Sequence, residues 1–451
     1  MKFEICGEEI NLRRLVLLVI LPLVCLGAAA AFFLPGSMVR LALMLLLVLP
    51  VVFLFIDRPT VVFCLLIIIL FSNLDVFIAP VRAFRYILIF FLASFAVSIA
   101  NGRRVVSHHP LMIALLAAFT ILAFQSISVA RDVDVSIVRL SAFLKILLYL
   151  GIISQFARDR KEFRRFLLFV AGGTLLSSLL PFVLRPPAHF ASLSVLWGQG
   201  VVRYEGFVFE PNTFALFQIF VIPILIFFVG VFRKPAVARF LFMLAILASI
   251  AVLVLSFSRG GFIALACLLA LLVVVERGNK PLLLFGFVLI AAGIMLFPGV
   301  YWERMRSMLD FGGRGQSDFA ILTRLETMRT AFRLGLENPI LGVGIDNFIY
   351  QSRHFIPYRL VVHNAFLQIF SELGFIACSV FLGIIAYNMA IIFRMMRNRG
   401  DAEAAQLGRA LLMQQVAILV SSLFIPIAYD MVFWFALGLP AIADYAYRDK
   451  S

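Results

Sequence analysis

Apolar runs of membrane-spanning length recur along almost the whole chain. Most of them have about 17–25 residues, which is the length a helix needs to cross the hydrocarbon core of a bilayer. Hydrophobic residues make up 63% of the 451 residues, 49 of them are Phe, and the mean hydropathy is +1.07. A soluble core cannot bury that much apolar surface. The pattern therefore predicts an all-α fold: a polytopic integral membrane protein with about 12–14 transmembrane helices.

The runs divide the chain into membrane and loop regions. The predicted spans lie at 15–34, 38–56, 60–79, 86–100, 111–129, 140–156, 166–184, 213–232, 240–256, 261–275, 281–297, 364–393, 410–427 and 431–447. They group into N-terminal helices (1–184), a loop (185–212), central helices (213–297), a large loop (298–363) and C-terminal helices (364–451). The large loop precedes the third-last span.

Lys and Arg are distributed unequally between the two sets of loops. With the N-terminus inside, the cytoplasmic segments carry 22 of these residues and the short loops on the opposite side carry 8. Positive side chains favour the cytoplasmic side of a membrane, so we predict that both termini are cytoplasmic and both large loops are external. We attribute most of the net charge of +15 to this topology and expect no nucleic-acid binding.

The middle of the large loop, SDFAILTRLETMRTAFRLGLENP, has the period of an amphipathic helix. Leu322 and Phe332 fall near one face, and Arg324 lies away from it. The pair Asn338-Pro339 predicts the end of the helix. We expect this helix to lie along the outer membrane interface.

The stretch VVHNAFLQIFSELGFIA, at 361–377, places an imidazole at the mouth of an apolar run. His363 is predicted at the outer membrane surface, and Asn364 is a good N-cap for the helix that follows. Gly374 comes eleven residues after His363, so in an unbroken helix the two share a face and the glycine admits a close neighbour. A histidine in this place is also explained by a capping or interfacial position alone.

Two arginines lie near the same predicted surface. Arg203 precedes the eighth span in VVRYEGFVFEPN, and Arg259 lies in SFSRGGF, the short turn between the ninth and tenth spans. An arginine in the membrane is costly and usually has a partner, although each of these is also explained by snorkelling to the interface. Together with His363, two arginines on one side suit a phosphate-bearing lipid head group.

Other site classes have weaker support. The five cysteines are scattered without a CxxC pair, and the outer loops have no cluster of Asp and Glu, so we expect no metal site. The GVG at 342–344 lacks the third glycine of a dinucleotide loop. Its glycines predict a tight turn, either purely structural or with amides that face a phosphate or sugar.

Several motifs resemble those of the O-antigen ligase and polymerase superfamily of bacterial envelopes. HN, then nine residues, then Gly374 resembles the histidine signature of the family, although Ala377 stands where the ligase form has Gly, Thr or Tyr. RYEGFVFEPNTFA, FSRGG and NPILGVGIDNF resemble three further segments of the family. The resemblance covers about 200–385, with the motifs in order and all on the predicted outer side.

The resemblance implies an inverting, metal-independent glycosyltransferase without a cofactor, in the bacterial inner membrane. Its members take a glycan from undecaprenyl pyrophosphate at the periplasmic face and transfer it to a sugar hydroxyl. In that chemistry Arg203 and Arg259 stabilise the leaving pyrophosphate, and His363 is the catalytic residue that takes or orients the acceptor proton. The supporting residues are Asn364, Gly342, Gly344, Asn212 and Gly374.

Alternatives remain open. Ligases use the lipid A core as acceptor and polymerases use another lipid-linked repeat, and the motifs leave both possible. A lipid-linked glycan transporter or flippase predicts charges near the bilayer midplane and pseudo-repeated halves. Here Lys145 is nearly alone deep in a span, which favours an enzyme with a one-sided site. A structural scaffold leaves Arg259 and His363 unexplained.

Overall fold

A computed structural model of the chain describes two units, Met1–Val106 and Ser107–Ser451, each treated by itself below. The described residues are 2–5, 8–11, 59–73, 88, 91–92, 95–96, 99–100, 109–184, 203–206, 208, 210–232, 236–276, 316–355 and 360–448. The predicted spans 15–34, 38–56 and 281–297 lie outside them, as does most of 86–100.

The first unit contains a short hairpin that the all-α prediction did not include. Strand β1 (Lys2–Ile5) pairs antiparallel with β2 (Glu8–Asn11), with Phe3 opposite Ile10. Strands of four residues are too short for a period-2 pattern to stand out in a sequence. The apolar helix α4 (Pro59–Ser72) covers most of the predicted span 60–79.

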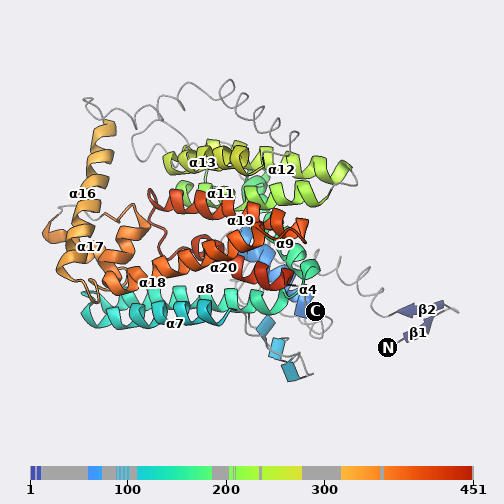
Figure 1. Ribbon diagram of the computed structural model, residues 1–451, viewed down its shortest axis with the longest axis horizontal. Coiled ribbons are helices and arrows are strands. Elements are labelled where there is room, and N and C mark those ends of the chain that lie inside the picture. Colours follow the sequence, from blue (N-terminus) through green and yellow to red (C-terminus); the bar gives the residue numbers. More distant parts are fainter. Residues whose placement is uncertain are drawn as a thin grey trace, which may run out of the picture. The chain divides into compact units, whose positions relative to one another are not determined.

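Every described secondary-structure element of the second unit is a helix (Figure 1). Its elements are α7 (Pro110–Gln125), η2 (Ser126–Val129), α8 (Val133–Phe156), α9 (Arg160–Leu184), α11 (Pro211–Val231), α12 (Ala236–Leu255), α13 (Arg259–Val275), α16 (Gln316–Glu337), α17 (Phe348–Gln351), η3 (Ser352–His354), α18 (Ala365–Met396), α19 (Ala402–Ser422) and α20 (Met431–Tyr447).

Six helices of the described part are long and apolar enough to cross a membrane, and α13 and α20 are shorter apolar helices. The chain is thus a multi-pass membrane protein of the all-α class, as predicted.

Helix α19 begins at Ala402, eight residues before the predicted span. Its first turns contain charged residues, so their hydropathy is too low for a predicted membrane span. The helix begins there because the Asp401 side chain caps it by accepting the Ala404 amide.

Helix α11 is buried along most of its length and packs against α9, α12, α13 and α19. Polar side chains of α19 hold it in place: Gln414 Nε2 donates to the Phe220 carbonyl at 2.7 Å, and Gln406 Nε2 donates to the Phe227 carbonyl at 3.2 Å. Hydrogen bonds of this kind fasten helices where apolar burial gives no preference between a neighbouring helix and lipid.

An aromatic cluster joins α7, α8, α18 and α20. The ring of Trp434 lies 5.0 Å from Phe119, 4.8 Å from Phe143 and 6.1 Å from Phe381, measured between centroids. The indole Nε1 of Trp434 donates to the Ala428 carbonyl at 2.7 Å, so the one polar atom of the ring is satisfied.

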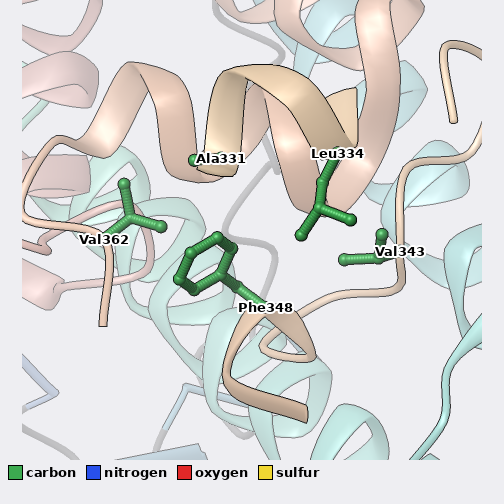
Figure 2. Packing of buried hydrophobic residues seen from close by; sticks show 5 residues of the cluster. All are labelled: Ala331, Leu334, Val343, Phe348 and Val362. Carbon is green, nitrogen blue, oxygen red and sulfur yellow. The ribbon is translucent and has the colours of Figure 1, made fainter. Parts of the chain in front are cut away.

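Helix α16 confirms the amphipathic helix predicted in the large loop, and it ends just before Asn338 as predicted. Figure 1 shows that its axis runs across the direction of α7, α8 and α18, and it packs against α18. Leu322 and Phe332 are 61% and 53% exposed, so an apolar row faces outward as an interfacial helix requires. A second apolar face packs into a buried cluster, shown in Figure 2: Ala331, Leu334, Val343, Phe348 and Val362.

Helix α18 is interrupted at Gly374, where φ is 82° and ψ is −178°. The amide of the next residue, Phe375, donates to the Pro339 carbonyl at 2.7 Å, and a Cβ at Gly374 would lie 2.6 Å from the Ile340 carbonyl oxygen. The predicted shared face of His363 and Gly374 is therefore wrong, because it assumed an unbroken helix. The close neighbour of the glycine is the loop backbone after α16.

We predict that Gly374→Ala lowers the thermal unfolding temperature of the purified protein. Only glycine adopts this φ and ψ readily, the strain in other residues is about 1–3 kcal/mol, and the added Cβ clashes with backbone. The matched control is Gly383→Ala in the same helix, where the new Cβ meets a single side-chain atom at 3.7 Å. Equal unfolding temperatures for the two variants would contradict this account of the break.

Candidate functional site

His363 lies in the short segment that leads into α18. Before it, Val362 is 1% exposed in the buried cluster of Figure 2; after it, the Asn364 side chain accepts the Leu367 amide at 3.0 Å. The structure therefore confirms the prediction that Asn364 is the N-cap of α18. A buried anchor on one side and a cap on the other fix the backbone of the half-buried histidine.

Arg203 is bonded to the end of α12 and the start of α11. Its Nε donates to the Ser256 carbonyl, and its Nη2 donates to Asn212 Oδ1, both at 3.0 Å. The neighbouring Tyr204 amide donates to the Leu255 carbonyl at 2.9 Å, so the backbone is held as well. These bonds hold the half-buried guanidinium of Arg203 between the end of α12 and the start of α11.

Asn212 connects the two arginines that the sequence singled out. Its Oδ1 also accepts the Ser258 hydroxyl at 2.9 Å, and its Nδ2 donates to Glu210 Oε1 at 2.8 Å. Ser258 in turn caps α13, whose first residue is Arg259. The turn after α12 and the start of α11 are thus joined through one amide side chain.

Arg324, on the polar side of α16, is a third cation at this place. Burial lowers its pKa, and the positive charges of Arg259 and Arg203 lower it further. Burial also lowers the pKa of Arg203, with Glu210 and Glu205 opposing the shift and Arg259 adding to it. The structure therefore gathers three partly buried guanidinium groups whose mutual repulsion an anion would relieve.

His363 faces the same group of charges. Its pKa is lowered to about 4, first by burial and then by the positive charge of Arg324, while Glu210 opposes the shift. The imidazole is neutral at neutral pH, so it has a free lone pair for a hydroxyl proton. His363, Arg203 and Arg259, predicted as one site, are brought together with Arg324 as the group that links them.

Two carboxylates complete the surroundings, and both are N-caps. Glu210 accepts the Thr213 amide at the start of α11, and Asp430 accepts the Val432 amide at the start of α20. Burial raises the pKa of Asp430 to about 6; backbone amides oppose the shift and Glu210 adds to it.

Glu210, Arg324 and Asp430 were not singled out from the sequence. An acidic residue directly before an apolar helix is a readable capping signal, whereas nothing in the sequence shows that α16 turns Arg324 toward the other arginines.

Gly342 and Gly344 have a structural role. Their φ angles are 64° and 96°, and the amides of 342, 343 and 344 donate to the carbonyls of Asn338, Ser371 and Glu372 at 2.9–3.0 Å. These amides are used within the protein, which supports the tight turn and contradicts the alternative in which they face a phosphate or sugar. In the described residues, no group of three or more His, Cys, Asp or Glu side chains is placed to hold a metal ion.

The arrangement described so far belongs to a multi-pass membrane protein with a cationic site at one end of its helices. Residues 244–382 match the family model described as O-antigen ligase. The chain therefore carries a domain of the O-antigen ligase and polymerase superfamily, which confirms the resemblance seen in the motifs. The matched region includes Arg259, Arg324 and His363. A search of curated proteins found no match.

We predict that His363 titrates near pH 4 in the protein without substrate, as measured by NMR of ring-labelled histidine. Replacing Arg324 with Gln removes a positive charge that disfavours the imidazolium, so the pKa of His363 should rise. Arg333→Gln is the control, because Arg333 is exposed and paired with Glu337 on the same helix. A His363 pKa near 6.5 in the parent protein would contradict the buried, cation-facing placement.

Proposed function

We propose that the protein transfers a glycan from undecaprenyl pyrophosphate to a sugar hydroxyl at the periplasmic face of the bacterial inner membrane. The O-antigen ligase domain supports a membrane glycan transferase of the ligase or polymerase type. The observation that carries the particular donor is the set of three clustered guanidiniums: Arg203, Arg259 and Arg324. Arginine binds phosphate through paired, charge-assisted hydrogen bonds, and a pyrophosphate offers enough oxygens for several such groups.

The chemistry proposed is a direct displacement with inversion. The acceptor oxygen forms a bond to the anomeric carbon, while the bond from that carbon to the pyrophosphate oxygen breaks and its electron pair leaves with the phosphate. Arg203, Arg259 and Arg324 stabilise the charge that develops on the leaving group. No metal or other cofactor is needed for this role.

His363 takes the acceptor proton, or orients the hydroxyl, in this proposal. With a pKa of about 4 in the free protein, the imidazole is unprotonated and ready to accept. The negative charge of a bound pyrophosphate favours the imidazolium and raises the pKa, which makes the group a stronger base when the donor is present. Asn364 and Asn212 position His363 and Arg203 without taking part in bond making.

The charge bias of the loops supports the orientation. The helix ends at Arg203, Arg259 and His363 lie on the side whose short loops carry few Lys and Arg, so we assign the site to the periplasmic side and both termini to the cytoplasm. A cysteine at the exposed Glu326 should react with an impermeant thiol reagent in intact spheroplasts, and one at Ala402 should not, in a background without native cysteines. The reverse labelling would invert the assignment.

We favour the lipid A core as acceptor, so that the protein acts as a ligase. Deletion should then leave polymer on the carrier lipid and remove it from the lipid A core, as seen by electrophoresis of envelope glycans. Single repeat units that remain on the core would instead identify a polymerase of surface polysaccharide.

Replacement of Arg203, Arg259 or Arg324 by Ala should weaken binding of undecaprenyl pyrophosphate in nanodiscs and reduce transfer. Loss of a charge-assisted hydrogen bond costs about 1.5–3 kcal/mol, or roughly ten- to hundredfold. Arg→Lys should be impaired too, because it keeps the charge and loses the planar fork. His363→Ala should abolish transfer with little change in donor binding.

Arg329→Ala is the matched control, since Arg329 is an exposed arginine of α16 five residues after Arg324. If all three arginine variants bind the donor and transfer glycan at parental levels, the three arginines only anchor the protein at the membrane interface. Donor movement across the membrane without any transfer by the purified protein would instead support a transporter.

A further inference from the structure

A second charged region lies at the other end of α18. There, α18, α19 and α20 surround a cavity of about 910 Å³. Its lining includes three guanidinium groups, those of Arg394, Arg397 and Arg448, beside the apolar side chain of Phe393. None of these residues takes part in the proposed transfer.

Asp444 organises two of these cations. Its carboxylate is 7% exposed and accepts Arg394 Nη2 and Arg448 Nη2, each at 2.9 Å. His109 Nε2 lies 3.2 Å from the same carboxylate, and its Nδ1 is hydrogen-bonded to the Tyr387 hydroxyl at 3.0 Å. The ring of contacts from α7, α18 and α20 holds both guanidiniums in fixed positions.

The lining is more positive than its own carboxylate can balance. Arg394, Arg397 and Arg448 supply three positive charges against the one negative charge of Asp444. The side chains of Arg394 and Arg448 are also 57% and 55% exposed, so part of each guanidinium fork is open to the cavity side. Because Asp444 already orders these forks, an anion that binds them restricts little further side-chain motion.

The depth of the cavity matches that of lipid head groups. From Phe375, just after the interruption, to Arg394, α18 spans roughly 30 Å at 1.5 Å per residue, which is close to the thickness of the hydrocarbon core of a bilayer. The cavity and His363 therefore lie at opposite membrane surfaces whichever way the protein is inserted. Phe393, 46% exposed, adds an apolar wall where an acyl chain would begin.

We propose that this cavity binds the phosphodiester head group of an anionic glycerophospholipid, with its acyl chains along the apolar surface at Phe393. Basic pockets between helices at the cytoplasmic surface are a known form of lipid recognition. The guanidinium groups bind the phosphate. The exposed ring of Phe393 gives a lipid an apolar contact that free phosphate cannot make, so the site prefers the lipid. The site lies apart from the transfer site and binds lipid without the donor.

The test uses the full-length protein purified in detergent and counts bound lipid by native mass spectrometry, with thermal unfolding as the second readout. Phosphatidylglycerol should bind and raise the unfolding temperature, while phosphatidylethanolamine and inorganic phosphate at the same concentration should not. The double variant Arg394→Gln/Arg397→Gln should lose affinity for phosphatidylglycerol by about tenfold or more.

The matched control is Arg399→Gln, which removes an exposed arginine that does not line the cavity and should bind lipid like the parent. The single variant Arg397→Gln leaves both ion pairs of Asp444 intact, so a partial loss of affinity there separates lipid binding from folding. Equal binding of phosphatidylethanolamine, equal stabilisation by inorganic phosphate, or parental affinity in the double variant would overturn the proposal. Failure of glycan transfer leaves this test unaffected, because no donor is present.

Discussion

Backbone hydrogen bonds between the turn after α16 and the interruption in α18 hold together the end of the protein that carries His363. Where α18 breaks at Gly374, the carbonyls of Ser371 and Glu372 accept the amides of Val343 and Gly344 instead of continuing the helix. A bilayer protein must satisfy its backbone polar groups internally, so a break of this kind needs other hydrogen-bond partners, and the backbone of the turn supplies them here. The pairing ties α16 to α18 and so brings Arg324 to the side of the bundle that carries His363.

Both ends of the helices carry clustered arginines, and at the end opposite His363 a carboxylate forms ion pairs with two of them. At the end with His363, half-buried guanidiniums of Arg203 and Arg324 lie near each other and near Arg259, and their lowered pKa values express the cost of that placement. At the opposite end, Asp444 compensates part of the positive charge through direct ion pairs. The first arrangement suits an anion that arrives, reacts and leaves, as a pyrophosphate donor does. The second suits a ligand that stays.

Sequence patterns predicted the individual elements well where local physics decides them. Hydropathy predicted the membrane helices, the amphipathic period predicted α16 and its end, and Asn364 was recognised as a cap because capping depends on a few adjacent residues. The break at Gly374 was missed, since a glycine inside an apolar run reads equally as a packing residue. The hairpin at Lys2–Asn11 was missed because its strands are so short.

The sequence by itself determined the class of protein, the ends of most described helices and the motifs of the O-antigen ligase domain, because these depend on composition and on residues close together in the chain. Only the tertiary structure decided which charges meet. Arg203 and Arg324 are separated by more than a hundred residues, and their approach depends on helix packing: α11, α13 and α18 all pack against α19, and α16 packs against α18. The pKa of His363 follows from the same packing, since burial and a neighbouring cation set it and neither is a property of the local sequence.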